Sequence, residues 1–340
     1  MQPLRFVPAS WPLGGPEEDV AGCEASECES AARNLRFQNN PRSTIITRTL
    51  ENAGLRPTRR ADFNILWQKK FPNAFQLRQL APHVRVNHIP GMNLITYKHE
   101  LVQTLRAAAA RASKASPEAV AKEAEAIDAL KTAVTYLPQT WLLPTEFESL
   151  KAEWDGHSPL IVKRGVSARG EGIELTVELP DVQRVAKDAA SSATTSICSK
   201  YIERPFIVNG RKFDLRIYVC VLSIIPLRAY VHREILARFC VSTYKEGAET
   251  LHDRARHLTN YSINKLELEP EPESEASSQP MHDMSTALKW RLPTLVSYLT
   301  TSLAEGGAGL SEVDWIACWS EIRKLLSSVI RASCGPVRRA

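Results

Sequence analysis

The sequence predicts an α+β fold in which antiparallel sheets are flanked by helices. Residues 213–222 and 227–232 alternate apolar and polar side chains with the period of two that is typical of strands, and residues 235–241 follow as a third strand. Residues 101–134 are dense in Ala, Glu and Lys, which are among the strongest helix formers. Because residues 224–226 leave room only for a tight connection, we expect the strands to form an antiparallel meander.

Composition divides the chain into four regions. Residues 1–60 are rich in Pro, Gly, Ser, Glu and Arg with weak periodicity, which predicts a disordered leader. Aromatic residues then begin, so we expect an N-terminal and helical region over 61–150, a central region over 151–205, and a C-terminal region over 206–340. An acidic run with prolines at 266–280 is expected to be a solvated insert.

Charge and cysteine content exclude several classes of protein. The 340 residues carry 43 basic and 38 acidic side chains, and a net charge of +5 is too small for a dedicated nucleic-acid binder. Seven scattered cysteines do not suggest a disulfide framework, and Cys23 and Cys28 lack the further ligands of a zinc site. The chain shows neither a signal peptide nor an apolar run long enough to span a membrane. We expect a soluble protein in a reducing, intracellular compartment.

Lys163 ends an apolar strand directly before a glycine-containing loop, residues 167–172. A lysine in this position can meet a phosphate as a point charge, or it can simply point to solvent. The loop glycines allow backbone N–H groups to approach an oxyanion, although many such loops only turn a hairpin. The order strand, loop, strand differs from the strand, loop, helix of a Walker-type loop.

Lys212, Asp214 and Arg216 share one face of a predicted strand, opposite an apolar face. They either pair as a structural ladder of salt bridges or line a cleft for a charged ligand. Arg228 and Arg238 on the neighbouring predicted strands favour the cleft, because clustered arginines need an anion to offset their repulsion. The polar run at residues 257–262 could bind phosphate or an amino acid, or it could be an ordinary loop.

In this order, the segments resemble the tubulin–tyrosine-ligase-like (TTLL) family over roughly residues 61–330, and most closely its polyglutamylase-type branch. The matching strings are Asn-His-Ile-Pro-Gly at 87–91, Pro-Gln-Thr-Trp-Leu-Leu-Pro at 138–144, and residues 161–163, 167–173, 200–203, 210–219, 226–228, 236–239 and 257–265. The resemblance implies an ATP-grasp-like fold, with ATP held between a central lobe over 151–205 and a C-terminal lobe over 206–340.

The resemblance also implies a reaction and its participants. In that family the γ-phosphate of ATP passes to a carboxylate, and an amine attacks the acyl-phosphate to form an amide. The glutamylase branch implies ATP and Mg²⁺ as cofactors, and tubulin or microtubules and free glutamate as partners, with no nucleic acid and no membrane. It further implies a monomer in the cytoplasm and cytoskeleton, including the cilium, flagellum or basal body.

The motifs carry family roles onto particular positions. The residues implied in catalysis are Lys163 and Arg216, the latter facing the γ-phosphate. The residues implied in nucleotide binding are Lys163, Arg169, Gly170, the hinge residues Ser199, Lys200, Tyr201 and Ile202, and Lys212, Phe213, Asp214, Thr259 and Asn260. The residues implied in holding the incoming amino acid are Arg238, Tyr261, Ser262 and Lys289. No metal ligand is assigned.

The chain departs from the family pattern at three places. Arg164 follows the strand lysine where the family usually has proline, and Ser199 replaces the hinge glutamine. The strands that carry the Asp and Glu-x-Asn ligands of Mg²⁺ are expected beyond Ala340. The sequence therefore leaves two hypotheses: an ATP-dependent protein-glutamate ligase, or a truncated, non-catalytic relative that binds nucleotide or microtubules. A third, a small-molecule ATP-grasp ligase, is disfavoured by residues 257–265.

Overall fold

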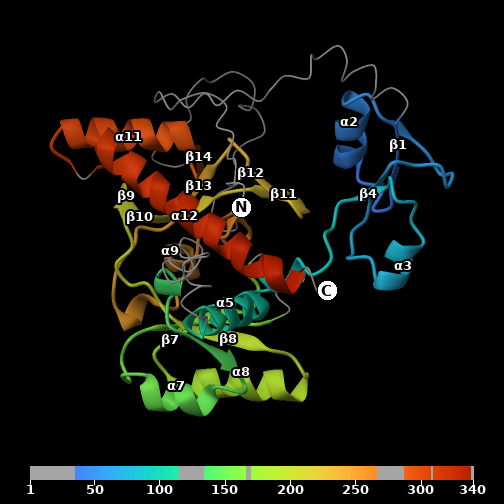
Figure 1. The fold of residues 1–340 in the computed structure, drawn as a ribbon. Helices are drawn as coiled ribbons and strands as arrows, with labels where there is room; N and C mark the ends of the chain where they lie inside the picture. The colour runs from blue at the N-terminus through green and yellow to red at the C-terminus, as the bar shows by residue number, and fades with distance from the viewer. Residues whose placement is uncertain (1–34, 115–133, 166–169, 266–286, 308, 338–340) are drawn as a thin grey trace. The chain divides into compact units, whose positions relative to one another are not determined.

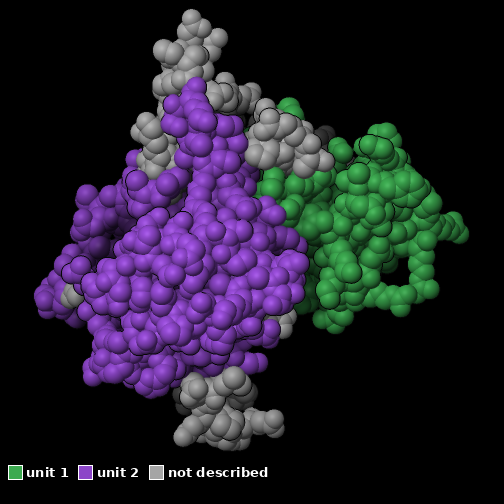
Figure 2. Space-filling model, turned by 90° about the horizontal axis from the view of Figure 1, so that it is seen from below, with its two compact units in different colours: residues 1–94, 221–229, 334–340 green, residues 95–220, 230–333 purple. Residues whose placement is uncertain are grey.

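The structure is a computed structural model that describes residues 35–114, 134–165, 170–265, 287–307 and 309–337. The chain divides into two compact units, of which one comprises residues 1–94, 221–229 and 334–340 and the other residues 95–220 and 230–333 (Figure 2). None of the helices in these described ranges is both long enough and apolar enough to cross a membrane.

The first unit contains a parallel four-stranded sheet with the strand order β2-β1-β3-β4. Its strands are β1 (Arg36–Asn39), β2 (Arg56–Pro57), β3 (Ile65–Trp67) and β4 (Arg85–Val86), and the helices along this stretch are α2 (Thr44–Asn52), α3 (Ala74–Arg78) and α4 (Asn93–Thr96). Asn87 ties the end of β4 to the residue after β3, because its side chain accepts from the Gln68 N–H and donates to the Gln68 carbonyl. This contact gives a structural role to the Asn-His-Ile-Pro-Gly string.

The prediction of a disordered leader was wrong for residues 35–60. These residues form β1, α2 and β2, and Phe37 and Leu55 are buried in the unit. Composition missed them because β1 has only four residues, both residues of β2 are exposed, and α2 has no fully buried side chain. Residues 1–34 lie outside the described residues. The sheet is also parallel, whereas antiparallel sheets were expected.

The central sheet of the second unit is antiparallel throughout, with the strand order β5-β8-β6-β7. Its strands are β5 (Thr140–Leu143), β6 (Leu160–Lys163), β7 (Ile173–Thr176) and β8 (Ser196–Lys200). One face packs on α7 (Phe147–Glu153) and α8 (Leu179–Ser191), which lie side by side, and the other face is covered by α5 (Lys98–Ser113) (Figure 1). Helix α5 confirms the predicted helix up to Ser113, and residues 115–133 lie outside the description.

Strand alternation decides which side chains face which helices. Leu143, Val162 and Cys198 are fully buried on the face covered by α7 and α8. On the other face, Ile197 packs against Val102 of α5. Because Lys163 is the direct cross-strand partner of Ile197, its side chain lies on the α5 face.

The C-terminal sheet has the strand order β14-β13-β10-β9. Its strands are β9 (Ile207–Val208), β10 (Arg211–Arg216), β13 (Leu236–Phe239) and β14 (Lys289–Arg291), and the remaining helices are η1 (Ala248–Thr250), α9 (Arg254–His257), α10 (Tyr261–Asn264), α11 (Leu292–Ala304) and α12 (Glu312–Val337). Helix α11 packs against β13 and β14, whereas α9 packs against β10. Helix α12 places Val329 and Ala332 against Leu105 and Ala108 of α5. The acidic insert at 266–280 lies outside the described residues.

The predicted meander is confirmed in the pairing of its first two segments and wrong in the pairing of the third. The expected strand over 213–222 breaks at Ile217–Tyr218 into β10 and β11 (Val219–Ile224). Strand β11 pairs with β12 (Leu227–Val231) in a separate two-stranded sheet, and β10 pairs instead with β13. The tight connection at residues 224–226 is confirmed. Alternation fixes the two faces of a strand but does not choose its neighbour.

The α7–α8 face of the central sheet should carry much of the stability of this unit. Leu143 is fully buried there, so we expect Leu143→Ala to lower the free energy of unfolding by about 2–5 kcal/mol. Urea denaturation followed by tryptophan fluorescence measures this change. Val313→Ala, at a position that is 75% exposed, is the control and should change stability by less than about 0.5 kcal/mol. Equal effects of the two substitutions would contradict the assigned core.

Candidate functional site

Two lysines meet where α5 covers the central sheet. Lys163 ends β6 on the α5 face, and Lys98 is the first residue of α5. Burial lowers the pKa of Lys163, and the positive charge of Lys98 lowers it further. Burial also lowers the pKa of Lys98. Within the described ranges Lys163 forms no ion pair with an acidic side chain, so no carboxylate there neutralises its charge.

A third lysine joins them from β10. The Nζ of Lys212 donates to the hydroxyl oxygen of Tyr201 over 2.8 Å and lies 4.3 Å from the centre of the tyrosine ring. Burial lowers the pKa of Lys212 to about 8, and the positive charge of Lys163 acts in the same direction. We call Lys98, Lys163 and Lys212 the lysine cluster. It joins the central sheet, α5 and the C-terminal sheet.

Lys98 was not predicted from the sequence. It follows Tyr97 at the start of a helix, without a motif that would distinguish it from a surface lysine. Only the packing of α5 on the central sheet brings it to Lys163.

A row of charged side chains crosses the C-terminal sheet on the face opposite its aromatic core. Asp214, Arg238 and Lys289 are direct neighbours on β10, β13 and β14. Arg238 donates from Nε and Nη2 to the two oxygens of Asp214, over 2.8 and 2.5 Å, and these hydrogen bonds raise the pKa of Arg238. Thr259 donates to Asp214 over 2.9 Å. We call the three residues the charged row, and part of the predicted salt-bridge ladder is therefore present.

The polar run after β13 lies over the charged row. The Nζ of Lys289 is 3.5 Å from the centre of the Tyr261 ring, a cation–π contact. Asn264 is fully buried, donates to the carbonyls of Leu258 and Asn260, and accepts from the N–H of Val241. This asparagine holds the run in place, so it is more ordered than an ordinary loop.

Gly170 connects the glycine loop to the same polar run. Its φ of +87° lies in the left-handed region, and an added Cβ would stand 2.7 Å from Ile263 Cδ1 and 3.1 Å from Asn260 Cγ. Its carbonyl accepts a hydrogen bond from Arg254 Nη2 over 2.6 Å. The structure therefore brings together Gly170 and Asn260, which were both predicted to bind nucleotide. Arg169 lies outside the described residues.

The hinge residues are partly occupied by protein contacts. The N–H groups of Lys200 and Tyr201 donate to the carbonyls of Gln139 and Pro159. The Ser199 hydroxyl is 2.8 Å from Thr140 Oγ1, so serine at this position is satisfied within the sheet. The Nζ of Lys200 is 3.9 Å from Asp155. Ile202 is 57% exposed.

Several predicted residues stand apart from the lysine cluster and the charged row. Phe213 faces the opposite side of β10, where it packs against Phe239. Arg216 is exposed at the end of β10, with its guanidinium 5.0 Å from the Tyr218 ring centre. Arg228 is exposed and belongs to the other unit. Ser262 lies in α10, beside Tyr261.

Arg164 has a structural contact that accounts for its departure from the family pattern. It forms ion pairs with Glu174 at 3.2 Å and Asp188 at 3.0 Å, which link β7 to α8. It therefore supports the edge of the sheet.

The described residues do not form a binding site for a magnesium ion. No group of three or more His, Cys, Asp or Glu side chains able to hold a metal occurs there. Asp214 lies on the same strand as Lys212, and its oxygens already accept from Arg238 and Thr259.

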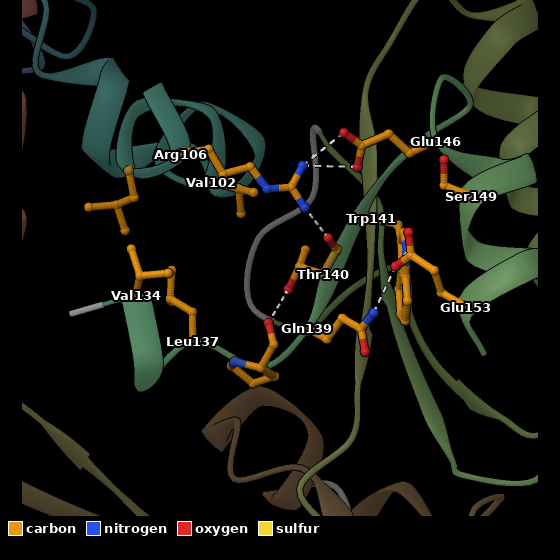
Figure 3. A pocket seen from close by; sticks show the side chains of 12 residues that line it. Val102, Arg106, Val134, Leu137, Gln139, Thr140, Trp141, Glu146, Ser149 and Glu153 are labelled. Atoms are coloured by element: carbon orange, nitrogen blue, oxygen red, sulfur yellow. Dashed lines mark hydrogen bonds and ion pairs between the residues drawn. The ribbon is translucent and has the colours of Figure 1, made fainter. Parts of the chain in front are cut away.

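A cavity of about 380 Å³ lies between α5 and β5, away from the lysine cluster (Figure 3). Arg106 donates to both Glu146 oxygens, over 2.8 and 3.0 Å, and Glu153 accepts from Gln139 and Trp141. The positive charge of Arg106 is balanced by Glu146, and Glu153 adds a negative charge that only neutral donors contact, so this lining does not favour a phosphate-bearing ligand.

The chain was compared with known proteins to find its family. The sequence profile of the tubulin-tyrosine ligase family matches residues 75–338. A tubulin polyglutamylase of Caenorhabditis elegans, ttll-4, is 36% identical over 202 residues, which cover 59% of this chain and 29% of the relative. A probable beta-tubulin polyglutamylase of Tetrahymena thermophila is 31% identical over 209 residues, covering 60% of this chain and 15% of the relative. The mouse tubulin polyglutamylase TTLL6 is 29% identical over 267 residues, covering 77% of this chain and 28% of the relative.

The profile match spans most of the chain, so the chain belongs to the tubulin-tyrosine ligase family. The resemblance predicted from the motifs is confirmed, including the similarity to polyglutamylases. The chain spans 15–29% of the length of these relatives.

The bidentate pair of Asp214 and Arg238 should show a measurable coupling. Both side chains are partly exposed, at 39% and 23%, so we expect about 1 kcal/mol rather than the larger value of a fully buried pair. A double-mutant cycle with Asp214→Ala and Arg238→Ala, followed by urea denaturation, measures this coupling. The cycle for Lys324 and Glu321, a pair on the surface of α12, is the control and should give about 0.5 kcal/mol or less. Additive effects of the Asp214 and Arg238 substitutions would contradict the pairing.

Proposed function

We propose that the second unit binds ATP, with its triphosphate held by the lysine cluster. The convergence of Lys98, Lys163 and Lys212 carries this proposal, because these partly buried ammonium groups place positive charge around Lys163, which repels both neighbours, and a polyanion would stabilise them. The fold would then be of the ATP-grasp type, with the nucleotide between the central sheet and the C-terminal sheet. Family membership supports this assignment.

Other residues would complete the nucleotide site. Gly170 and Asn260 are in contact and would lie against the phosphates, as would Thr259. The main chain around Ile202 would bond to adenine, because the N–H groups of Lys200 and Tyr201 are already used. Asp214 would meet the ribose and phosphate region, and Arg216, exposed at the end of β10, would face the γ-phosphate.

We propose further that the reaction is an ATP-dependent ligation that attaches glutamate to the side-chain carboxylates of tubulin tails. ATP supplies the phosphoryl group that activates the acceptor carboxylate. The amine of free glutamate then attacks the acyl carbon, phosphate leaves, and an amide forms. Lys163 and Arg216 would stabilise the charge that develops on the transferred group. The polyglutamylases among the relatives support this substrate class.

The charged row would bind the incoming amino acid. Lys289 offers positive charge to the carboxylates of glutamate, Arg238 adds the guanidinium N–H groups that its pairing with Asp214 leaves available, and Tyr261 and Ser262 offer hydroxyl groups beside them. Two cationic residues at this place favour an acidic amino acid over glycine or tyrosine. The protein would act as a monomer on tubulin in the cytoplasm and the cytoskeleton, including cilia, flagella or basal bodies.

A second candidate is a relative that binds nucleotide or microtubules without ligation. It is favoured by one observation, that the described residues contain no cluster of ligands for a metal. ATP binding is common to both candidates, and the chemical step separates them.

Removing the charge of Lys163 should weaken ATP binding. We expect Lys163→Met to raise the Kd for ATP at least about tenfold, because a charge-assisted contact to phosphate is worth roughly 1.5–3 kcal/mol. Isothermal titration calorimetry measures the affinity. Lys187→Met, at an exposed position on α8, is the matched control and should bind like the wild type. Equal affinity of both variants would refute the assigned phosphate site.

Affinity for ATP should also fall as the pH rises through about 8. Lys212 has its pKa lowered to about 8, so it is charged below that pH and increasingly neutral above it. We expect the Kd for ATP to increase from pH 7 to pH 9, and Lys212→Met to bind more weakly and to lose most of this dependence. Calorimetric titrations at three pH values test this, and a Lys212→Met variant that retains the full pH dependence would contradict it.

The ligase proposal predicts which amino acid is incorporated. With ATP, Mg²⁺ and purified tubulin, we expect incorporation of radiolabelled glutamate and not of glycine or tyrosine. Arg238→Ala should abolish it while ATP binding persists. Incorporation of tyrosine or glycine alone would overturn the glutamate assignment. ATP binding without incorporation of any amino acid would select the non-catalytic candidate.

A further inference from the structure

A buried histidine links the lysine cluster to a backbone carbonyl. His257 ends α9 and is 2% exposed. Its Nδ1 lies 3.1 Å from the hydroxyl oxygen of Tyr201. Its Nε2 lies 3.0 Å from the carbonyl oxygen of Thr250 and 3.1 Å from the Thr250 hydroxyl oxygen, whose hydrogen is directed to the carbonyl of Gly247 at 2.8 Å. The rings of Tyr201 and Tyr244 both pack edge-on against it. Its orientation is therefore fixed from several sides.

The hydrogen bonds of His257 determine which nitrogen carries the hydrogen. A carbonyl oxygen can only accept, so Nε2 donates to Thr250. Burial lowers the pKa of His257, and the positive charge of Lys212 acts in the same direction, so the ring is neutral. A neutral imidazole has one N–H, so Nδ1 is an acceptor.

This assignment fixes the direction of the next hydrogen bond. Tyr201 must donate its hydroxyl hydrogen to Nδ1 of His257, which leaves the oxygen lone pairs for the Nζ of Lys212 at 2.8 Å. The Tyr244 hydroxyl donates to the carbonyl of Glu203, so its hydrogen does not compete for the Tyr201 oxygen, but its own oxygen is a second acceptor within reach of the Tyr201 hydroxyl. The chain of donors runs from Lys212 to Tyr201, His257 and Thr250, and such chains strengthen each bond.

We propose that His257 is a positioning residue: by accepting the Tyr201 hydrogen, it keeps the Tyr201 oxygen facing Lys212 and so holds that ammonium group charged and in place for a phosphate-bearing ligand. The statement that the ligand bears phosphate rests on the proposed function, whereas the positioning of Lys212 by His257 does not. Without an acceptor at Nδ1, the Tyr201 hydroxyl can turn its hydrogen to the Tyr244 oxygen or toward Lys212, and the second orientation becomes more populated than in the wild type. The neutral amine accepts that hydrogen, so the neutral form of Lys212 gains stability.

Apart from His257 itself, whose neutral ring adds no charge, the groups that face Lys212 are the same in all the variants of the test. Lys163 on β6 lowers its pKa through repulsion, whereas Asp214 on β10 and Cys240 after β13 raise it when they are negatively charged. A change in the titration of Lys212 on substitution of His257 can therefore be assigned to the Tyr201 contact.

The substitutions His257→Asn and His257→Gln distinguish a positioning role of His257 from a purely structural one. His257→Asn keeps an oxygen acceptor near the place of Nδ1, whereas His257→Gln keeps a donor for Thr250 but no acceptor for Tyr201. His257→Phe removes both, and His252→Phe, at an exposed position in the same segment, is the matched control. Thermal melting identifies variants that do not fold, and the Asn and Gln pair keeps the comparison informative if His257→Phe fails.

The first measurement is the pH dependence of acetylation at Lys212, by a limiting amount of acetic anhydride, in nucleotide-free protein with residue-resolved mass spectrometry. We expect a midpoint near pH 8 for the wild type, His252→Phe and His257→Asn. We expect it to be lower by about half a pH unit or more for His257→Gln and His257→Phe. Retention of the midpoint in His257→Gln together with a shift in His257→Asn would overturn the proposal, as would equal midpoints in all variants.

The second measurement is the Kd for ATP at pH 7 and pH 8.5. We expect His257→Gln and His257→Phe to lose affinity more at pH 8.5 than at pH 7, and His257→Asn to follow the wild type. If the acetylation midpoints shift as expected but even the wild type does not bind ATP, the proposed function fails while the positioning role stands. If the wild type binds ATP and no midpoint moves, the positioning role fails alone.

Discussion

Burial of one face of the central sheet against α7 and α8 is the constraint on which the functional arrangement depends. Leu143, Val162 and Cys198 are fully buried on that face, so every second residue of β5, β6 and β8 is directed to the other side. Lys163 is placed against α5 for this reason, and α5 in turn brings Lys98 to it. The apolar core therefore sets the geometry of the charged groups, although it contacts none of them.

The lysine cluster and the charged row differ in how their charge is balanced. Arg238 in the row is neutralised by Asp214, while Lys163 in the cluster has no carboxylate among the described residues. Burial lowers the pKa values of all three lysines, and the positive charge of a neighbouring lysine lowers those of Lys163 and Lys212 further, so an anion at this place would be stabilising. Rigid supports such as Asn264 and His257 keep the surrounding polar groups in place without adding charge.

Much of this could be predicted from local pattern, and the remainder depended on long-range packing. The strands and their faces follow from a period of two, so the positions of Lys163 and Asp214 on their strands could be predicted from the sequence. The partner of a strand depends on distant residues, and the pairing of β10 with β13 was therefore missed. Lys98 has no local signal, and residues 35–60 have too few buried side chains to stand out from a disordered segment. The roles of the site residues stay predictions.

The contact between Gly170 and Ile263 also bears on the order of folding. It joins two parts of the chain that are far apart in sequence, and such contacts close large loops at an entropic cost. Helices α5 and α8 can form from local contacts, but Gly170 acquires its neighbours only after the polar run has docked beside β13. The end of the glycine loop at Gly170 is therefore expected to be among the last parts of the unit to form, after the apolar core has folded.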